Sequence, residues 1–151
     1  MRVDFYQLSR DPAEAVLPLI ARNTLKAGER LLVVSDDADQ LGRISNGLWG
    51  RIADSFLAHG FAGNEHDPRQ PILLSGEMAP GNAARFVAIA DGVWRAEIFK
   101  EGGEPAFERT FYIFGDETLQ GARECWVMLG KRGGVERKFW KQQGAKWVEG
   151  P

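Results

Sequence analysis

Alternating strand and helix patterns in the first 48 residues constrain this chain more than any other feature of its sequence. Residues 3–8 are rich in β-branched and aromatic side chains, which predicts a strand that starts almost at the first residue. Residues 9–12 supply a helix-start signal, and apolar side chains then recur at helical spacing up to Gly28, despite Pro18 within the pattern. Residues 30–35 form a short apolar run, typical of a strand buried on both faces.

A second helix is predicted directly after this run. Aspartates at positions 36, 37 and 39 can cap a segment that carries Leu41, Ile44 and Leu48 at helical spacing. The opening is therefore β-α-β-α, which implies parallel strands joined by right-handed crossovers. We predict the α/β class.

Beyond Leu48 the pattern becomes irregular. Residues 49–71 are punctuated by glycine, asparagine and proline, which predicts a long surface connection, and such connections often carry a functional site. Residues 71–75 and 85–90 are two further apolar strands. Since they are too close in sequence for a crossover helix between them, we expect one of them at an edge of the sheet.

The last third of the chain predicts a strand, a helix and a hairpin. The strand covers residues 108–114, and the helix ends near Gly130. The apolar stripe of this helix consists of Leu119, Ala122, Trp126 and Leu129. Residues 135–148 alternate apolar and polar side chains around Gly144, as in a small C-terminal hairpin. No repeat or linker divides the chain, so we expect a single α/β domain over residues 1–151.

The charge balance weighs against direct nucleic-acid binding. The chain has 19 Lys and Arg against 21 Asp and Glu, so a formal charge of −2 offers no general attraction to phosphates. Single-strand binding through its tryptophans would need a basic groove along them. These tryptophans are Trp49, Trp94, Trp126, Trp140 and Trp147. The N-terminus lacks a signal-peptide pattern, and no apolar run reaches the ~20 residues that span a bilayer, so we expect a cytoplasmic protein outside the membrane.

The chain carries no complete catalytic or cofactor signature. Residues 9–12 replace the glycine-rich turn that follows the first strand of dinucleotide-binding proteins, and no P-loop occurs. His59 and His66 have no second ligand at metal-binding spacing, and Cys125 is interpreted as a small buried apolar residue. We expect no enzyme activity, cofactor or metal. The alternative is a small nucleotide-binding enzyme on a Rossmann-like sheet, supported by the β-α-β-α opening alone.

Arg123 and Trp126 are three positions apart on the last predicted helix, so their side chains are neighbours on its surface. A tryptophan beside a guanidinium suits a peptide that ends in an aromatic residue and a free carboxylate. Helix periodicity alone favours a simpler interpretation, in which Trp126 belongs to the core and Arg123 is a solvated charge. Trp49 is equally open: it either anchors the following loop or contributes to a site.

Several segments of the chain resemble the chi subunit family of bacterial DNA polymerase III, an accessory protein of the clamp loader. These segments are residues 3–8, residues 48–49 leading to 54–60, residues 70–74, residues 122–126, and residues 139–142 with Trp147. The resemblance implies a three-layer α/β/α fold with a mainly parallel central sheet and no catalytic activity.

The resemblance also implies partners and a site. Members of the family bind the acidic C-terminal tail of single-stranded DNA-binding protein. By position, Arg123 would bind the terminal carboxylate, and Trp49, Phe56 and Trp126 would line the adjacent apolar pocket. A second surface of the family contacts the clamp loader through a psi subunit, or a repair helicase.

This chain departs from the family near Arg123. Leu119 and Val127 stand where relatives carry additional basic residues, and the basic pair Lys131 and Arg132 follows later. Because exposed ion pairs contribute only ~0–1 kcal/mol each, we expect weaker attraction of the tail rather than loss of binding.

Overall fold

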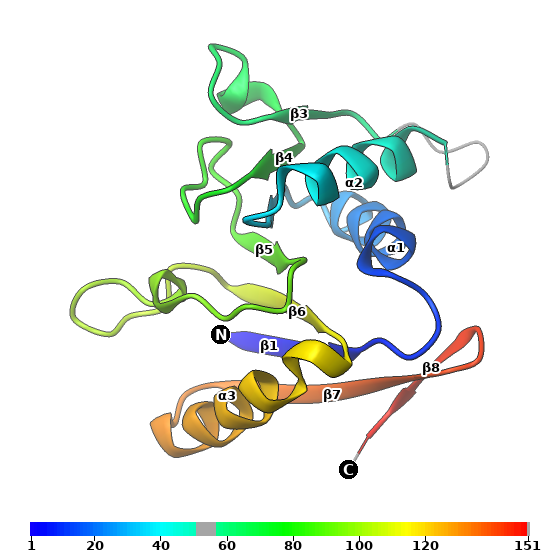
Figure 1. Cartoon of the computed structure of the whole chain (residues 1–151). Helices are drawn as coiled ribbons and strands as arrows, with labels where there is room; N and C mark the ends of the chain where they lie inside the picture. The colour runs from blue at the N-terminus through cyan, green and yellow to red at the C-terminus, as the bar shows by residue number, and fades with distance from the viewer. Residues whose placement is uncertain (51–56, 151) are drawn as a thin grey trace.

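In the computed structural model, which describes residues 1–50 and 57–150, eight strands form one sheet in the order β3-β4-β2-β5-β6-β1-β7-β8 (Figure 1). The strands are β1 Arg2–Gln7, β2 Leu31–Val34, β3 His59–Phe61, β4 Ile72–Ser75, β5 Phe86–Ile89, β6 Arg109–Phe114, β7 Glu136–Gln143 and β8 Lys146–Glu149. All neighbours are parallel except β7 and β8, which form an antiparallel hairpin. The predicted α/β class, parallel sheet and C-terminal hairpin are confirmed.

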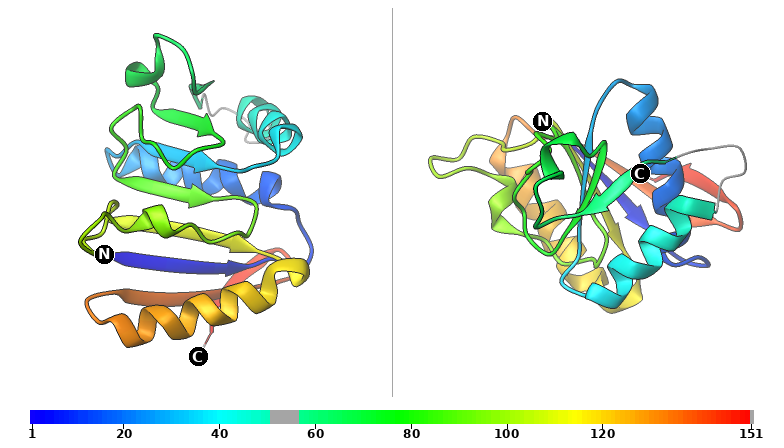
Figure 2. Two further views of the ribbon diagram at one scale, coloured as in Figure 1. Left: turned by 60° about the vertical axis from the view of Figure 1, so that its left-hand side comes forward. Right: turned by 90° about the horizontal axis from the view of Figure 1, so that it is seen from above.

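Helices cover both faces of this sheet (Figure 2). The α-helices of the described residues are α1 Ala13–Lys26, α2 Ala38–Gly50 and α3 Leu119–Arg132, and the short 3-10 helices are η1 Asp67–Arg69, η2 Ala96–Ile98 and η3 Asp116–Thr118. Strand side chains alternate between the faces: Leu31 and Val33 pack under α1 and α2, whereas Val3 and Phe5 pack under α3. The carboxylate of Asp37 caps α2, as expected, by accepting the amide hydrogens of Asp39 and Gln40 at 2.9 and 3.2 Å. None of the described helices is long and apolar enough to cross a membrane.

The central strands correct one prediction. Neither β4 nor β5 lies at an edge, because β4 pairs with β3 and β2, and β5 pairs with β2 and β6. Residues 76–85 connect β4 to β5 across β2 without an α-helix. All four residues of β4 are buried, as expected of an inner strand. The short sequence distance between the two strands therefore did not decide their place in the sheet.

Three boundaries also differ from the predictions. The connection expected over residues 49–71 contains β3 and η1. The three-residue strand β3 was not predicted, because it is defined by its pairing with β4 rather than by a pattern along the chain. Trp49 lies in the last turn of α2 rather than after it. The helix α3 continues past Gly130 to Arg132, where Gly133 ends it with a φ of 75° that favours glycine.

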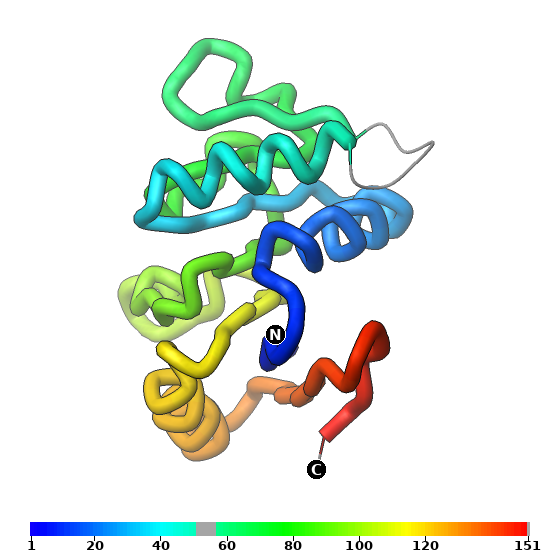
Figure 3. Tube along the Cα trace, turned by 45° about the vertical axis from the view of Figure 1, so that its right-hand side comes forward, coloured from blue at the N-terminus to red at the C-terminus, as the bar shows by residue number. Residues whose placement is uncertain are grey.

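The tail is part of the main sheet rather than a separate attachment. The eight residues of β7 run parallel to β1, in register from Arg2 opposite Glu136 to Gln7 opposite Lys141. Figure 3 shows the tail, orange to red, turning back on itself before the C-terminus. The turn uses Gly144 at a φ of 61°.

Candidate functional site

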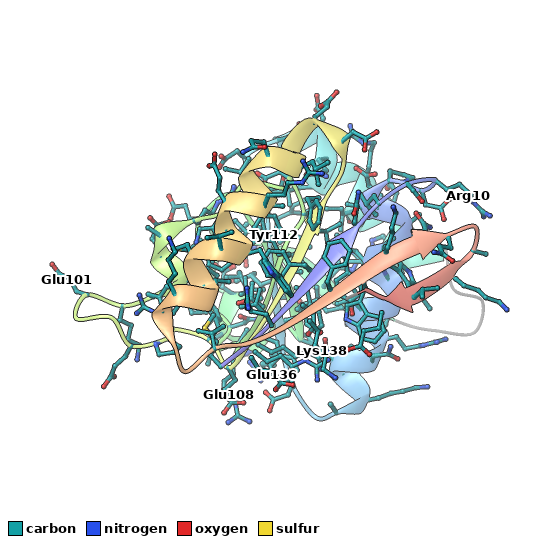
Figure 4. All side chains as sticks on the ribbon, turned by 90° about the horizontal axis from the view of Figure 1, so that it is seen from below. Arg10, Glu101, Glu108, Tyr112, Glu136 and Lys138 are labelled. Carbon is teal, nitrogen blue, oxygen red and sulfur yellow. The ribbon has the colours of Figure 1, made fainter. Side chains whose placement is uncertain are left out.

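A hollow of about 370 Å³ lies between α3 and the strands beneath it, and we call it the α3–β7 pocket. It is lined by Phe5 and Gln7 of β1, Phe114 of β6, Leu119, Ala122, Arg123, Trp126 and Val127 of α3, and Phe139 of β7. In Figure 4, side chains occupy the space between α3 and the strands, where Tyr112 is labelled. The wall is mostly aliphatic and aromatic, so the pocket suits an apolar side chain of a partner.

Trp126 forms one wall of the pocket and is held from three sides. Its ring meets the rings of Phe5 and Phe139 edge to face, at centroid distances of 5.1 and 6.2 Å. The Arg137 guanidinium lies 4.2 Å from the centroid of the Trp126 ring and donates a 2.6 Å hydrogen bond to the Trp126 carbonyl. The half-buried indole is therefore fixed in place before any partner arrives. Trp126 thus packs on the core and also lines the pocket.

Arg123 lies at the mouth of the same pocket and is exposed. The arginines of the strands beneath α3 are engaged in contrast: Arg2 and Arg109 pair with Asp4, each at 2.8 Å, and Arg137 donates to the Trp126 carbonyl. No ion pair within residues 1–50 and 57–150 includes Arg123. Its guanidinium is therefore available to a carboxylate at the edge of an apolar pocket, which is a geometry that suits a bidentate pair.

The structure does not bring Trp49 to this pocket. Trp49 is 53% exposed on α2, and its ring contacts His59 at a centroid distance of 4.5 Å. The helix α2 packs on the face of the sheet opposite to α3, so the groove expected around Trp49, Arg123 and Trp126 is not one groove. Phe56 lies outside the described residues. Of the four candidate residues, the pocket unites Arg123 and Trp126.

Sequence reasoning missed three aromatic walls of the pocket: Phe5, Phe114 and Phe139. They come from three strands that are neighbours in the sheet but far apart along the chain. Alternation of apolar side chains predicted the strands that carry Phe5 and Phe139, and Phe114 belongs to the predicted strand over residues 108–114. No local pattern could show that they share one pocket.

The place where a Rossmann-like sheet binds phosphate is filled by the chain itself. After β1, the backbone amides of Ser9, Arg10 and Asp11 all donate to the side-chain oxygen of Gln142, at 3.2, 3.1 and 3.2 Å. Three converging amides form a concavity that would otherwise suit an anion. A neutral side chain from β7 occupies it, so the nucleotide-binding alternative gains no support here.

A second polar cluster closes the carboxyl ends of β2 and β5, where ligands of such sheets also bind. Asp91 accepts hydrogen bonds from the Arg95 side chain at 2.7 Å and from the Asp36 amide at 2.9 Å. Burial alone would raise the pKa of Asp91, but hydrogen bonds from Arg95 and from the backbone amides of Asp36 and Val93 lower it below its ordinary value. The carboxylate is thus committed to internal contacts.

His59 and Cys125 lie in environments that suit a structural role. The His59 ring nitrogens lie 2.7 Å from the Ser45 hydroxyl and 2.8 Å from the Leu57 carbonyl oxygen. Burial raises the pKa of the Cys125 thiol to about 12, so thiolate chemistry near neutral pH is disfavoured. Within the described part of the chain, no group of three His, Cys, Asp or Glu side chains is placed to hold a metal ion.

Comparison with known proteins identifies the family of this chain. A model of the family described as DNA polymerase III chi subunit, HolC, matches residues 1–136. The DNA polymerase III subunit chi of Escherichia coli (strain K12) is 27% identical over 93 residues, which cover 57% of this chain and 63% of that protein. The aligned stretch thus spans less than two thirds of the relative, and most of β7 and all of β8 lie beyond the family match. This chain belongs to the DNA polymerase III chi subunit family.

Proposed function

We propose that this protein is a non-catalytic accessory subunit of the DNA polymerase III holoenzyme in the cytoplasm. In this role it binds the acidic C-terminal tail of single-stranded DNA-binding protein in the α3–β7 pocket, and thereby links that protein to the clamp loader during DNA replication. The observation that carries the proposal is an exposed guanidinium without an ion pair in the described chain, Arg123, beside an apolar pocket walled by Trp126.

The chemistry of the pocket matches a free C-terminus. A terminal carboxylate placed at Arg123 would receive two parallel N–H donors, and the last side chain of the tail would enter the α3–β7 pocket beside Trp126. A buried aromatic or aliphatic side chain would gain roughly 1.5–3 kcal/mol from leaving water. The carboxylate then supplies orientation, and the pocket supplies much of the affinity.

The expected affinity is modest. Arg123 is the one charged side chain among the described residues that line the α3–β7 pocket, because Leu119 and Val127 are apolar. Fewer cations lower the rate of encounter with an acidic tail and make binding less sensitive to salt. We therefore expect affinity that depends more on the apolar end of the tail than on its acidic residues.

The second expected surface must lie away from the α3–β7 pocket, so that both partners bind together. It would reach the clamp loader through a psi subunit, or contact a repair helicase. Trp49 is a candidate for this surface rather than for the tail site, because it lies on the opposite face of the sheet from α3.

Fluorescence anisotropy with a labelled acidic peptide that ends in an aromatic residue tests the tail site. We expect Arg123→Ala to weaken binding roughly tenfold or more, since a hydrogen bond to a charged group contributes about 1.5–3 kcal/mol. We expect a similar loss in Trp126→Ala, because the pocket loses an apolar wall. Amidation of the peptide should weaken wild-type binding similarly and remove the effect of Arg123→Ala. Trp49→Ala is the matched control and should leave the affinity unchanged.

Three outcomes would contradict this proposal. Wild-type binding no tighter than millimolar would exclude the tail as partner. Unchanged affinity in both Arg123→Ala and Trp126→Ala would place the site elsewhere. Tight binding of a nucleotide, measured in parallel by calorimetry, would favour the small-enzyme alternative.

A further inference from the structure

The pocket continues onto the outer face of α3. A second, shallow hollow, formed by side chains of α3 alone, shares Arg123 and Val127 with the α3–β7 pocket. It is lined by Gln120, Arg123, Glu124, Val127, Met128 and Lys131. Val127 and Met128 are 53% and 42% exposed, which is high for apolar side chains on a helix. A peptide that leaves the α3–β7 pocket past Arg123 would therefore meet exposed apolar side chains on α3. We call the surface from Arg123 past Val127 and Met128 to Lys131 the α3 strip.

The spacing of residues along the strip fixes the distance between its two basic side chains, Arg123 and Lys131. Arg123, Val127 and Lys131 are four residues apart, so they follow one stripe of α3. Since a helix rises 1.5 Å per residue, Arg123 and Lys131 stand about 12 Å apart along its axis. An extended peptide advances roughly 3.3–3.6 Å per residue, so three to four of its residues would bridge that distance.

Lys131 is the basic residue at the far end of the strip that is free to meet an acid. No ion pair in the described ranges 1–50 and 57–150 includes it. Its neighbour Arg132 is engaged elsewhere: the guanidinium lies 3.6 Å from the centroid of the Phe99 ring and donates to the Gly103 carbonyl. Only Lys131 of this pair lines the second hollow.

The charged residues of the strip are distributed unevenly along it. Among the described residues that line the second hollow, Glu124 is the one carboxylate, and it lies one position from Arg123. An acidic side chain close to the Arg123 end would be repelled by Glu124, whereas one at the Lys131 end would not. The strip thus favours an acid at a defined distance from the terminal carboxylate.

We propose that Lys131 is a specificity-determining residue that binds an acidic side chain three or four positions before the last residue of the bound tail. The peptide would cross Val127 in an extended conformation on its way from Arg123 to Lys131. This inference rests on the proposed function, because it requires the terminal carboxylate to lie at Arg123. It adds a register rule: the position of the acid along the tail matters, and not only the total charge.

A set of labelled octapeptides tests this rule. All end in the same aromatic residue with a free carboxylate, and one aspartate is moved through positions two to six before the end, with serine elsewhere. Against wild type, the peptide with its aspartate three or four positions before the end should bind roughly two- to fivefold tighter than the others, as exposed ion pairs allow. This preference should disappear in Lys131→Gln and shrink at high salt.

The matched control is Arg132→Gln, which removes the same charge one position further along α3. It should keep the positional preference.

An equal benefit at every position, or equal loss of the preference in Lys131→Gln and Arg132→Gln, would show general attraction and overturn the inference. If every peptide fails to bind the wild type, the proposed function itself fails. If the peptides bind in an Arg123-dependent way without positional preference, only the role of Lys131 is wrong.

Discussion

At the residue scale, Asp4 joins three strands of the sheet. Its side chain has no exposed surface, yet it carries a carboxylate in the middle of β1. It accepts hydrogen bonds from Arg2 at 2.8 Å, from Arg109 of β6 at 2.8 Å and from the Trp140 indole of β7 at 3.1 Å. A buried carboxylate is tolerated only when its partners replace the water it has lost.

Replacing this carboxylate by an amide should destabilise the protein. In Asp4→Asn, an N–H group would face a guanidinium, and one of the three donors would lose its acceptor. We expect the free energy of unfolding to fall by about 1–3 kcal/mol, with the lower part of this range favoured because both arginines are partly exposed to water. Urea unfolding followed by circular dichroism measures the change.

Glu136→Gln is the control for Asp4→Asn. Glu136 lies opposite Arg2 in the same sheet but is exposed, so its replacement should change the free energy of unfolding by less than about 0.5 kcal/mol. Equal effects of the two substitutions would show that Asp4 contributes no more than a surface charge.

At the scale of elements, β7 connects the fold to the candidate site. The first half of the strand supplies Phe139 to the α3–β7 pocket, and Arg137, two residues earlier, holds the Trp126 ring. The other end supplies Gln142, which binds the loop between β1 and α1 through three backbone amides and through Asp11 at 2.8 Å. The tail therefore contributes both to stability and to the shape of the pocket.

Removal of the Gln142 side chain should be costly. Gln142 is buried, and in Gln142→Ala three backbone donors of the β1–α1 loop would lose their acceptor. We expect a loss of about 1–3 kcal/mol in the free energy of unfolding, measured by urea denaturation. Gln143→Ala, at the next and exposed position, should be near neutral. A Gln142→Ala protein as stable as the Gln143→Ala protein would contradict an anchoring role for this residue.

At the scale of the whole molecule, three weak acids that are buried or half-buried predict alkaline instability. Burial raises the pKa of Tyr6, Tyr112 and Cys125 to about 12 in each case. The folded protein therefore keeps these protons at pH values where the unfolded chain, with ordinary values of 9.0 for Cys and 10.0 for Tyr, releases them. The stabilisation is complete below about pH 9 and is lost as the pH rises toward 12.

Unfolding in urea at a series of pH values from 8 to 11 tests this prediction. The free energy of unfolding should decrease with rising pH above about 9. Cys125→Ala should lower stability at pH 8, because it removes buried volume, but should decrease less steeply between pH 9 and 10.5. An identical slope in both proteins would mean that the thiol does not take part in the pH dependence.

The sequence was sufficient for features that depend on neighbours along the chain. The alternating opening predicted the α/β class and parallel strands, because strand and helix periods are local patterns. Glycine at position 144 and the alternation around it predicted the hairpin of β7 and β8. Arg123 and Trp126 were predicted as neighbours because residues three apart on a helix share a face, and the α3–β7 pocket includes both.

The tertiary structure decided everything that depends on strand order and on which face a helix covers. The pairing of strands brought Phe5, Phe114 and Phe139 into one pocket and placed β2 between β4 and β5. The packing of α2 on the face opposite to α3 separated Trp49 from Arg123. Periodicity shows that a side chain faces the interior, but not which distant side chain it meets there. That choice comes from the packing of the entire sheet, where contacts between residues far apart in sequence outweigh local preference.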